Sequence, residues 1–222
     1  MFRGGWFVLF VLAGAGSLAQ APPWPAGERL TYHLVWQGIG VGRLHLSADG
    51  IEGGWRFRLK LETTGLAQAV GYGLESESQV GQDFYTDRFW QTLTEPLKGT
   101  TRLMFERQEN NGSWARIMHP DGRLTSWSSS NEEVVDQLSL IYYLRIHPET
   151  RLVSAVDYPR LAQGRLEPLP VNGSGLVGYR LAREDLLVEI WYRQDVRRTP
   201  ARILFGRDFG RLEATLIENG NR

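Results

Sequence analysis

The chain of 222 residues carries 25 basic and 25 acidic side chains and no cysteine. A nucleic-acid-binding protein would show a basic excess or a basic stripe, so the balanced charge argues against that class. Without disulfides the fold must rest on its hydrophobic core, and a chain of this length is sufficient for one core in a single domain.

The N-terminal segment has the pattern of a secretory signal peptide. Arg3 supplies a positive charge, residues 6–15 form a short apolar run, and Ala19-Gln20-Ala21 is a small-x-small cleavage site. Because the apolar run is shorter than a membrane span requires, an uncleaved anchor is the less favoured alternative. We therefore expect residues 1–21 to be removed, which leaves residues 22–222 as a single β-rich domain, exported, soluble, not membrane-spanning, and located in the periplasm or cell envelope.

The domain opens with two stretches that predict a β-hairpin. In residues 30–36 and again in residues 44–48, apolar side chains alternate with polar ones, which is the pattern of half-buried strands. The glycine-rich residues 38–42 predict a turn, because a phosphate-binding loop would have to open a helix and here a strand follows. A three-residue turn that places Leu34 opposite Leu44 puts every apolar side chain on one face.

The same register places His33 opposite His45 on the polar face. Two histidines across a strand pair can begin a metal site, but zinc sites need three or four ligands and the sequence offers no third one nearby. We interpret the pair as solvated histidines and expect neither a metal nor a cofactor.

The following stretches continue the strand pattern. Residues 55–62 alternate most regularly, with Trp55 and Phe57 on an apolar face and charged residues on the other. Residues 66–70 predict a short helical turn, and the more polar residues 74–85 predict a strand at an edge or rim of the sheet.

Short strands separated by turn signals follow along most of the remaining chain, whereas residues 158–175, rich in Pro and Gly, predict a loop. The later strands are expected at residues 89–93, 100–108, 114–119, 124–128, 151–156, 177–182, 186–193, 202–205 and 212–217. The pattern predicts a mainly β protein: a large curved antiparallel sheet or incomplete barrel of about eleven strands around one principal α-helix at residues 131–146.

The helix prediction rests on signals at both ends. Ser130 and Glu133 fit a capping box, in which each side chain satisfies a free backbone N–H group of the other residue. His147-Pro148 stops the helix. Between these signals the segment is apolar over much of its circumference, so a concave sheet has to bury it.

The same helix carries Asp136 and Ser139, which resemble part of a hydrolase site. A serine nucleophile needs a base and an oxyanion hole, and the nearest histidine in the sequence, His147, lies beyond the helix end. We therefore interpret Asp136 and Arg145 as ties between the helix and neighbouring strands through charge-assisted hydrogen bonds, and we expect no enzymatic activity. A hydrolase is the remaining alternative.

Three stretches, residues 27–50, 134–145 and 191–216, resemble a family of exported bacterial proteins classified as domain of unknown function thirty-one-oh-eight. The resemblance reaches both ends of the mature chain. It implies structural roles for an opening hairpin, an Asp-x-x-Ser helix that ends in Arg, and a closing Trp-x-x-x-Asp-x-x-Arg-x-Pro hairpin. The matching residues are Gly42, Asp136, Ser139, Arg145, Trp191, Asp195, Arg198, Pro200 and Gly206. The family has no established activity.

The closing hairpin is also similar to one in periplasmic lipoprotein carriers, which are incomplete barrels with a helix plugging an apolar concavity. This similarity implies the same architecture as the strand pattern does. Because a fold does not define a function, it implies no activity by itself.

The leading hypothesis is a non-enzymatic envelope protein that binds or carries a lipid or acyl chain between the concave sheet and the helix. It rests on a surplus of apolar and aromatic residues on alternating strands, and the equal alternative is that these residues fill a packed core. The candidate ligand-binding residues are Trp36, Leu46, Trp55, Phe57, Leu59, Phe105, Leu138 and Tyr142. The second hypothesis is a structural or assembly protein that binds another envelope protein through a sheet edge or through residues 158–175.

Overall fold

The computed structural model describes residues 22–69, 71–108, 112–130, 133–157, 160–182, 187–207 and 210–217. The expected signal peptide therefore lies outside the described residues. Within them the strands are β1 (Glu28–Trp36), β2 (Ile39–Ile51), β3 (Gly54–Thr63), β4 (Gly73–Gly81), β5 (Thr86–Glu95), β6 (Gly99–Gln108), β7 (Gly112–Met118), β8 (Leu124–Ser129), β9 (Val134–Val135), β10 (Leu152–Asp157), β11 (Arg160–Leu169), β12 (Val177–Ala182), β13 (Leu187–Tyr192), β14 (Pro200–Arg207) and β15 (Gly210–Leu216). The helices are α1 (Gly65–Ala69) and α2 (Gln137–Ile146).

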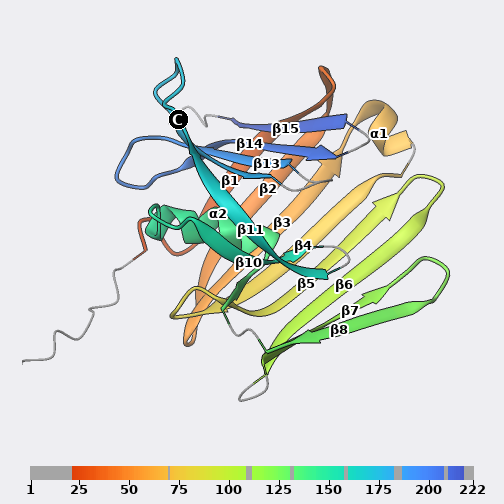
Figure 1. The fold of residues 1–222 in the computed structure, drawn as a ribbon. Coiled ribbons are helices and arrows are strands. Elements are labelled where there is room, and N and C mark those ends of the chain that lie inside the picture. The colour runs from red at the N-terminus through yellow and green to blue at the C-terminus, as the bar shows by residue number, and fades with distance from the viewer. Residues whose placement is uncertain are drawn as a thin grey trace, which may run out of the picture.

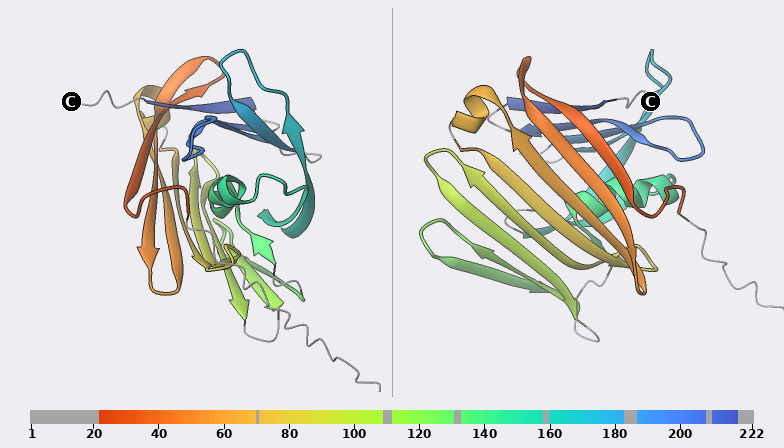
Figure 2. Two further views of the ribbon diagram at one scale, coloured as in Figure 1. Left: turned by 90° about the vertical axis from the view of Figure 1, so that its left-hand side faces the viewer. Right: turned by 180° about the vertical axis from the view of Figure 1, so that it is seen from behind.

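These strands form one large curved sheet around α2 (Figures 1 and 2). The strand order is β8-β7-β6-β5-β4-β3-β2-β1-β15-β14-β13-β12-β11-β10-β9. The described pairings are antiparallel except for β9 with β10, which is parallel. The mainly β class and the curved sheet are confirmed, but the described part of the chain has 15 strands rather than about eleven. Two of the strands that the sequence pattern missed are β9 and β11.

The opening hairpin forms in a register that differs from the predicted one by two residues. Leu44 pairs with Tyr32 instead of Leu34, and Leu34 pairs with Gly42. The predicted face assignment still holds, because a shift of two preserves the alternation of side chains between faces. The turn is shorter than expected, and a bulge after Leu34 absorbs Val41 as the extra residue.

Gly42 is required at this bulge. Its backbone φ is 152°, and a Cβ atom at this position would collide with the carbonyl oxygen of Glu62 on β3. Only glycine permits this close approach of two strands. The observed register also separates the two histidines, because His33 lies opposite Arg43 and not opposite His45.

The polar strand β4 lies in the interior of the sheet, between β3 and β5, so the prediction of an edge or rim strand was wrong. Ser76 and Ser78 are buried. Their polar character reflects hydrogen bonding inside the molecule rather than contact with solvent.

Residues 160–169 form β11, so the loop prediction was wrong for this part of residues 158–175. The first half of β11 pairs with β10 and the second half pairs with β12. Its Leu166 side chain is only 2% exposed. The end of this range does form a turn, in which the Asn172 side chain accepts hydrogen bonds from the backbone N–H groups of Ser174 and Leu176 at 3.0 Å each.

The principal helix begins later than the predicted range of 131–146. Val134 and Val135 form β9, and α2 runs from residue 137 to residue 146. Its capping box consists of Asp136 and Ser139, not of Ser130 and Glu133: Asp136 accepts the Ser139 N–H at 2.9 Å, and the Ser139 hydroxyl accepts the Asp136 N–H at 2.9 Å. The predicted end at His147 and the short helix α1 are both present.

Candidate functional site

The start of α2 is fixed to the concave face of the sheet by Asp136. Besides its cap bonds, this carboxylate accepts hydrogen bonds from the hydroxyls of Ser78 on β4 at 2.6 Å and Thr86 on β5 at 2.8 Å. The side chain is fully buried. Burial raises the pKa of the Asp136 carboxyl group, and the hydrogen bonds from Ser78, Ser139 and Thr86 oppose that rise.

The other end of α2 is fixed by Arg145. Its guanidinium group donates to both carboxylate oxygens of Glu28 on β1, at 2.6 and 3.0 Å, and to the carbonyl oxygen of Arg197 in the β13–β14 turn. The Arg145 side chain is 0% exposed and that of Glu28 is 7% exposed. This two-pronged, desolvated contact ties the helix to the first strand and to the closing hairpin.

Aromatic side chains fill the concavity beside Arg145. Phe57 on β3 stacks on Tyr142 of α2 with ring centroids 4.0 Å apart, and Trp24 contacts both rings edge-on. Trp55 packs against Trp24 at 5.6 Å. We call Trp24, Trp55, Phe57 and Tyr142 the aromatic cluster; it is a packed part of the core.

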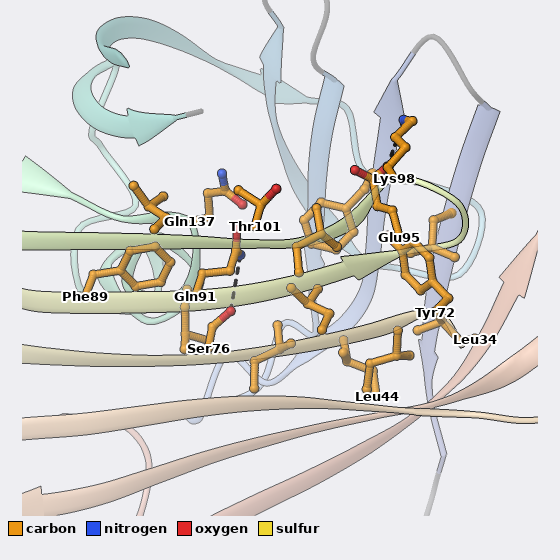
Figure 3. Close-up of a pocket in the computed structure, with 18 of the residues that line it drawn as sticks. Leu34, Leu44, Tyr72, Ser76, Phe89, Gln91, Glu95, Lys98, Thr101 and Gln137 are labelled. Carbon is orange, nitrogen blue, oxygen red and sulfur yellow. Dashed lines mark hydrogen bonds and ion pairs between the residues drawn. The ribbon is translucent and has the colours of Figure 1, made fainter. Parts of the chain in front are cut away.

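The remaining part of the concavity contains a cavity of about 550 Å³ (Figure 3). This volume falls within the range of about 300–1,000 Å³ that is usual for small-molecule sites. The cavity exists because α2 is only 10 residues long and lies toward one end of the sheet, away from α1 (Figure 1). Its apolar lining consists of Leu34, Leu44, Leu59, Leu61, Leu74, Phe89, Leu93, Leu103, Leu138, Ile141, Phe205 and Leu212.

A group of uncharged polar side chains interrupts this apolar lining, namely Ser76, Gln91, Thr101 and Gln137. Ser76 on β4 pairs directly with Gln91 on β5, and the Gln91 amide donates to the Ser76 hydroxyl at 3.2 Å. Figure 3 shows the side chains of Thr101 and Gln137 in the same part of the cavity as Gln91. We call these four residues the Gln91 cluster.

Charged residues of the lining lie in a different part of the cavity, at the β5–β6 turn (Figure 3). Lys98 and Glu95 form an ion pair at 3.0 Å, and the Lys98 side chain is 70% exposed. His119 and Pro120 from the neighbouring β7–β8 turn also line the cavity. The exposure of Lys98 shows that this part of the lining borders solvent, and we call it the rim.

Of the residues predicted to bind a ligand, Leu59 and Leu138 line the cavity. The others lie outside its lining. Trp55, Phe57 and Tyr142 belong to the aromatic cluster, Leu46 and Phe105 are buried in the core, and Trp36 is 40% exposed at the end of β1.

Sequence analysis did not single out the cavity residues of β4 and β5. The spacing of two residues between Leu74 and Ser76, and between Gln91 and Leu93, indicates that each pair shares a face of its strand. Polar residues on a strand usually face solvent, so Ser76 and Gln91 give no sign of an interior position. Which part of the concave face the helix leaves uncovered follows only from the folded sheet.

The closing hairpin bears several residues of the family motif and reaches α2. Asp195 accepts the backbone N–H of Thr199 at 3.3 Å, and Arg198 has a left-handed φ of 46°. The carbonyl oxygen of Pro200 accepts a hydrogen bond from the Tyr32 hydroxyl at 2.8 Å. These contacts shape the turn that presents the Arg197 carbonyl oxygen to the helix.

Two further motif residues lie on the strands of this hairpin. The Trp191 ring covers Gly178 on β12 so closely that a Cβ atom there would lie 2.7 Å from the ring. Gly206 packs against Leu187 and contributes to the lining of the cavity.

The polar atoms of Asp136 and Ser139 are used in capping. The Ser139 hydroxyl accepts the Asp136 N–H, is hydrogen-bonded to Thr86 at 3.1 Å, and is buried. His147 lies eight positions further along the chain, which corresponds to about 12 Å of helical rise, and it faces Glu149 at 3.6 Å. Ser139 and His147 therefore do not form a nucleophile–base pair.

Within the residues that the structure describes, no three His, Cys, Asp or Glu side chains are grouped as ligands for a metal ion. In the same part of the chain, no helix has the length and apolar character needed to cross a membrane.

No protein-family model matches the chain, and no curated protein matches it. The resemblance to domain of unknown function thirty-one-oh-eight therefore stays a prediction. Among solved structures, the chain is similar to the crystal structure of a beta-barrel-like protein of domain of unknown function DUF1849 from Brucella abortus, with a TM-score of 0.53 and 10% sequence identity over 86% of this chain and 96% of that chain. At this identity the likeness shows the fold alone, which is β-barrel-like.

Proposed function

We propose that this protein is a non-enzymatic, exported protein of the cell envelope that binds the apolar chain of a lipid or another acyl compound. The site is the cavity between the start of α2 and the concave face of the sheet. The observation that carries the proposal is the cavity of about 550 Å³ with its lining of leucine and phenylalanine side chains.

The anchoring of α2 supports this function. Because buried polar contacts of Asp136 and Arg145 hold both ends of the helix, α2 is not free to move over and fill the cavity. A bound chain gains about 0.8 kcal/mol for each methylene group that leaves water, so ten such groups contribute roughly 8 kcal/mol before ordering costs. Export is supported by the signal-peptide pattern of residues 1–21.

Filling the cavity tests the proposal. Leu93 lines the cavity, so Leu93→Trp should occupy part of it and weaken binding of a fluorescent acyl probe at least tenfold. Leu124 is 61% exposed at the start of β8, and Leu124→Trp is the matched control that should leave binding unchanged. An organic extract of wild-type protein purified without detergent should contain an acyl compound by mass spectrometry, and extracts of the Leu93→Trp variant should contain less of it. Equal probe binding by wild type and both variants would contradict the proposal.

A further inference from the structure

The Gln91 cluster is unusual for a cavity that takes only hydrocarbon. Gln91 lies on β5 between two apolar residues of the lining, Phe89 and Leu93. A primary amide offers two N–H donors and one carbonyl acceptor, and among the residues that the structure describes Gln91 uses one donor, in the hydrogen bond to Ser76. An amide held against an apolar ligand without a partner costs free energy, so a fully apolar wall would bind a plain hydrocarbon better.

The neighbours of Gln91 also retain hydrogen-bonding capacity. In the described part of the chain, the structure gives neither the Gln137 amide nor the Thr101 hydroxyl a side-chain partner, and both residues line the cavity. Thr101 is the diagonal neighbour of Gln91 across the β5–β6 pair, since it lies opposite Leu93. A ligand in the cavity can thus meet donors and acceptors from two strands and from the first residue of α2.

The charges near the cavity argue against a buried anion at the Gln91 cluster. The cation of the lining, Lys98, lies at the rim and is already paired with Glu95. A carboxylate or phosphate beside Gln91 would be desolvated without a cationic partner, which is far more costly than placing an uncharged group there.

We propose that the cavity selects an uncharged amphiphile and holds the ester, amide or hydroxyl group of that amphiphile against Gln91 and Gln137. This inference rests on the proposed function and adds the chemical class of the ligand. Gln91 and Gln137 are then specificity-determining residues, and the leucine side chains around them bind the attached hydrocarbon chain.

The test compares three probes with the same chain length: monodecanoylglycerol, decanoate and decane. Their affinities are measured by displacement of a fluorescent acyl probe from wild type and from Gln91→Leu, which replaces the amide by an apolar group of similar size. Gln79→Leu is the matched control, because Gln79 lies on β4 and its amide donates to Glu77, a residue outside the cavity lining. Gln137→Leu is a second test variant that leaves the Gln91–Ser76 hydrogen bond in place, and thermal unfolding shows that each variant is folded.

Wild type should bind monodecanoylglycerol roughly tenfold more tightly than either decanoate or decane, as expected for one or two net hydrogen bonds. Gln91→Leu and Gln137→Leu should each reduce that preference by weakening binding of monodecanoylglycerol, and Gln79→Leu should not. Equal affinity for the three probes would overturn the inference while leaving the proposed function standing. Tightest binding of decanoate, weakened by Lys98→Met but not by Gln91→Leu, would also overturn it, since the polar group would then lie at the rim. Failure of all three probes to bind would count against the proposed function itself.

Discussion

At the scale of single residues, Asp136 connects the start of the helix to two strands. Its carboxylate caps α2 through the N–H groups of Leu138 and Ser139 and binds two strands through Ser78 and Thr86. One side chain thereby starts the helix and sets its position on the concave face, which determines where the cavity begins. An Asp-x-x-Ser motif in the sequence therefore indicates a helix anchor in this protein.

The pH dependence of stability should report on Asp136. Because burial raises the pKa of this carboxyl group, the folded protein binds its proton more tightly than the unfolded chain does. The free energy of unfolding should therefore fall as the pH rises from the unfolded-state pKa, about 3.9, through the raised folded-state pKa. Urea titrations across this range should show the fall in wild type relative to Asp136→Asn, which cannot titrate at this position. Identical pH profiles for the two proteins would show that Asp136 does not cause the effect.

At the scale of elements, β11 shows how pairing overrides local turn signals. Proline and glycine predict a loop in this region, yet β11 continues the sheet between β10 and β12. It does so because both neighbouring strands offer backbone partners and because Leu166 enters the core. A segment with this role supports the fold and is not a detachable binding loop.

Substitution on β11 should therefore affect stability. Leu166→Asp places a charge at a position that is 2% exposed, and we expect a loss of about 3 kcal/mol or more in the free energy of unfolding. Glu167 is the exposed neighbour on the same strand, and Glu167→Gln should change the stability by less than about 0.5 kcal/mol. Urea denaturation of both variants distinguishes a buried strand from an exposed loop, since a loop would tolerate the two substitutions equally.

At the scale of the whole molecule, the buried Arg145 side chain connects the helix to two segments that are distant in the sequence. Arg145 on α2 binds Glu28 at the start of β1 and the Arg197 carbonyl oxygen near the start of β14. These segments are 117 and 52 residues away from Arg145 in the sequence. The contact fixes the helix against β1 and the β13–β14 turn and keeps the cavity open beside it.

Replacing both partners of the Arg145–Glu28 ion pair should lower the free energy of unfolding by less than the two single replacements added together. Glu28→Gln leaves the Arg145 charge buried without a counter-ion, and the expected loss is about 3–5 kcal/mol in the free energy of unfolding. The double variant Glu28→Gln/Arg145→Met should lose less than the sum of the two single variants, because no charge remains uncompensated. A double-mutant cycle by urea denaturation measures this difference. Strict additivity would mean that the two side chains do not interact as the structure indicates.

The sequence by itself determined the fold class, the buried faces of the first three strands and the end of the principal helix. These features depend on near neighbours in the chain: the alternation of Tyr32 and Leu34 with the polar residues between and beside them assigns a face whatever the exact register is. This is why the predicted pairing of the opening hairpin was wrong by two residues while its buried face was right.

Only the tertiary structure decided four other features: the start of α2, the interior position of β4, the strand β11 and the cavity. Asp136 caps the helix in place of the predicted Ser130, and Ser78 and Thr86 bind its carboxylate from strands distant in the sequence. The cavity depends on where a short helix rests inside a large curved sheet. Since that position is set by contacts between residues 50 or more positions apart, no local pattern could show that Gln91 and its neighbours face an open space.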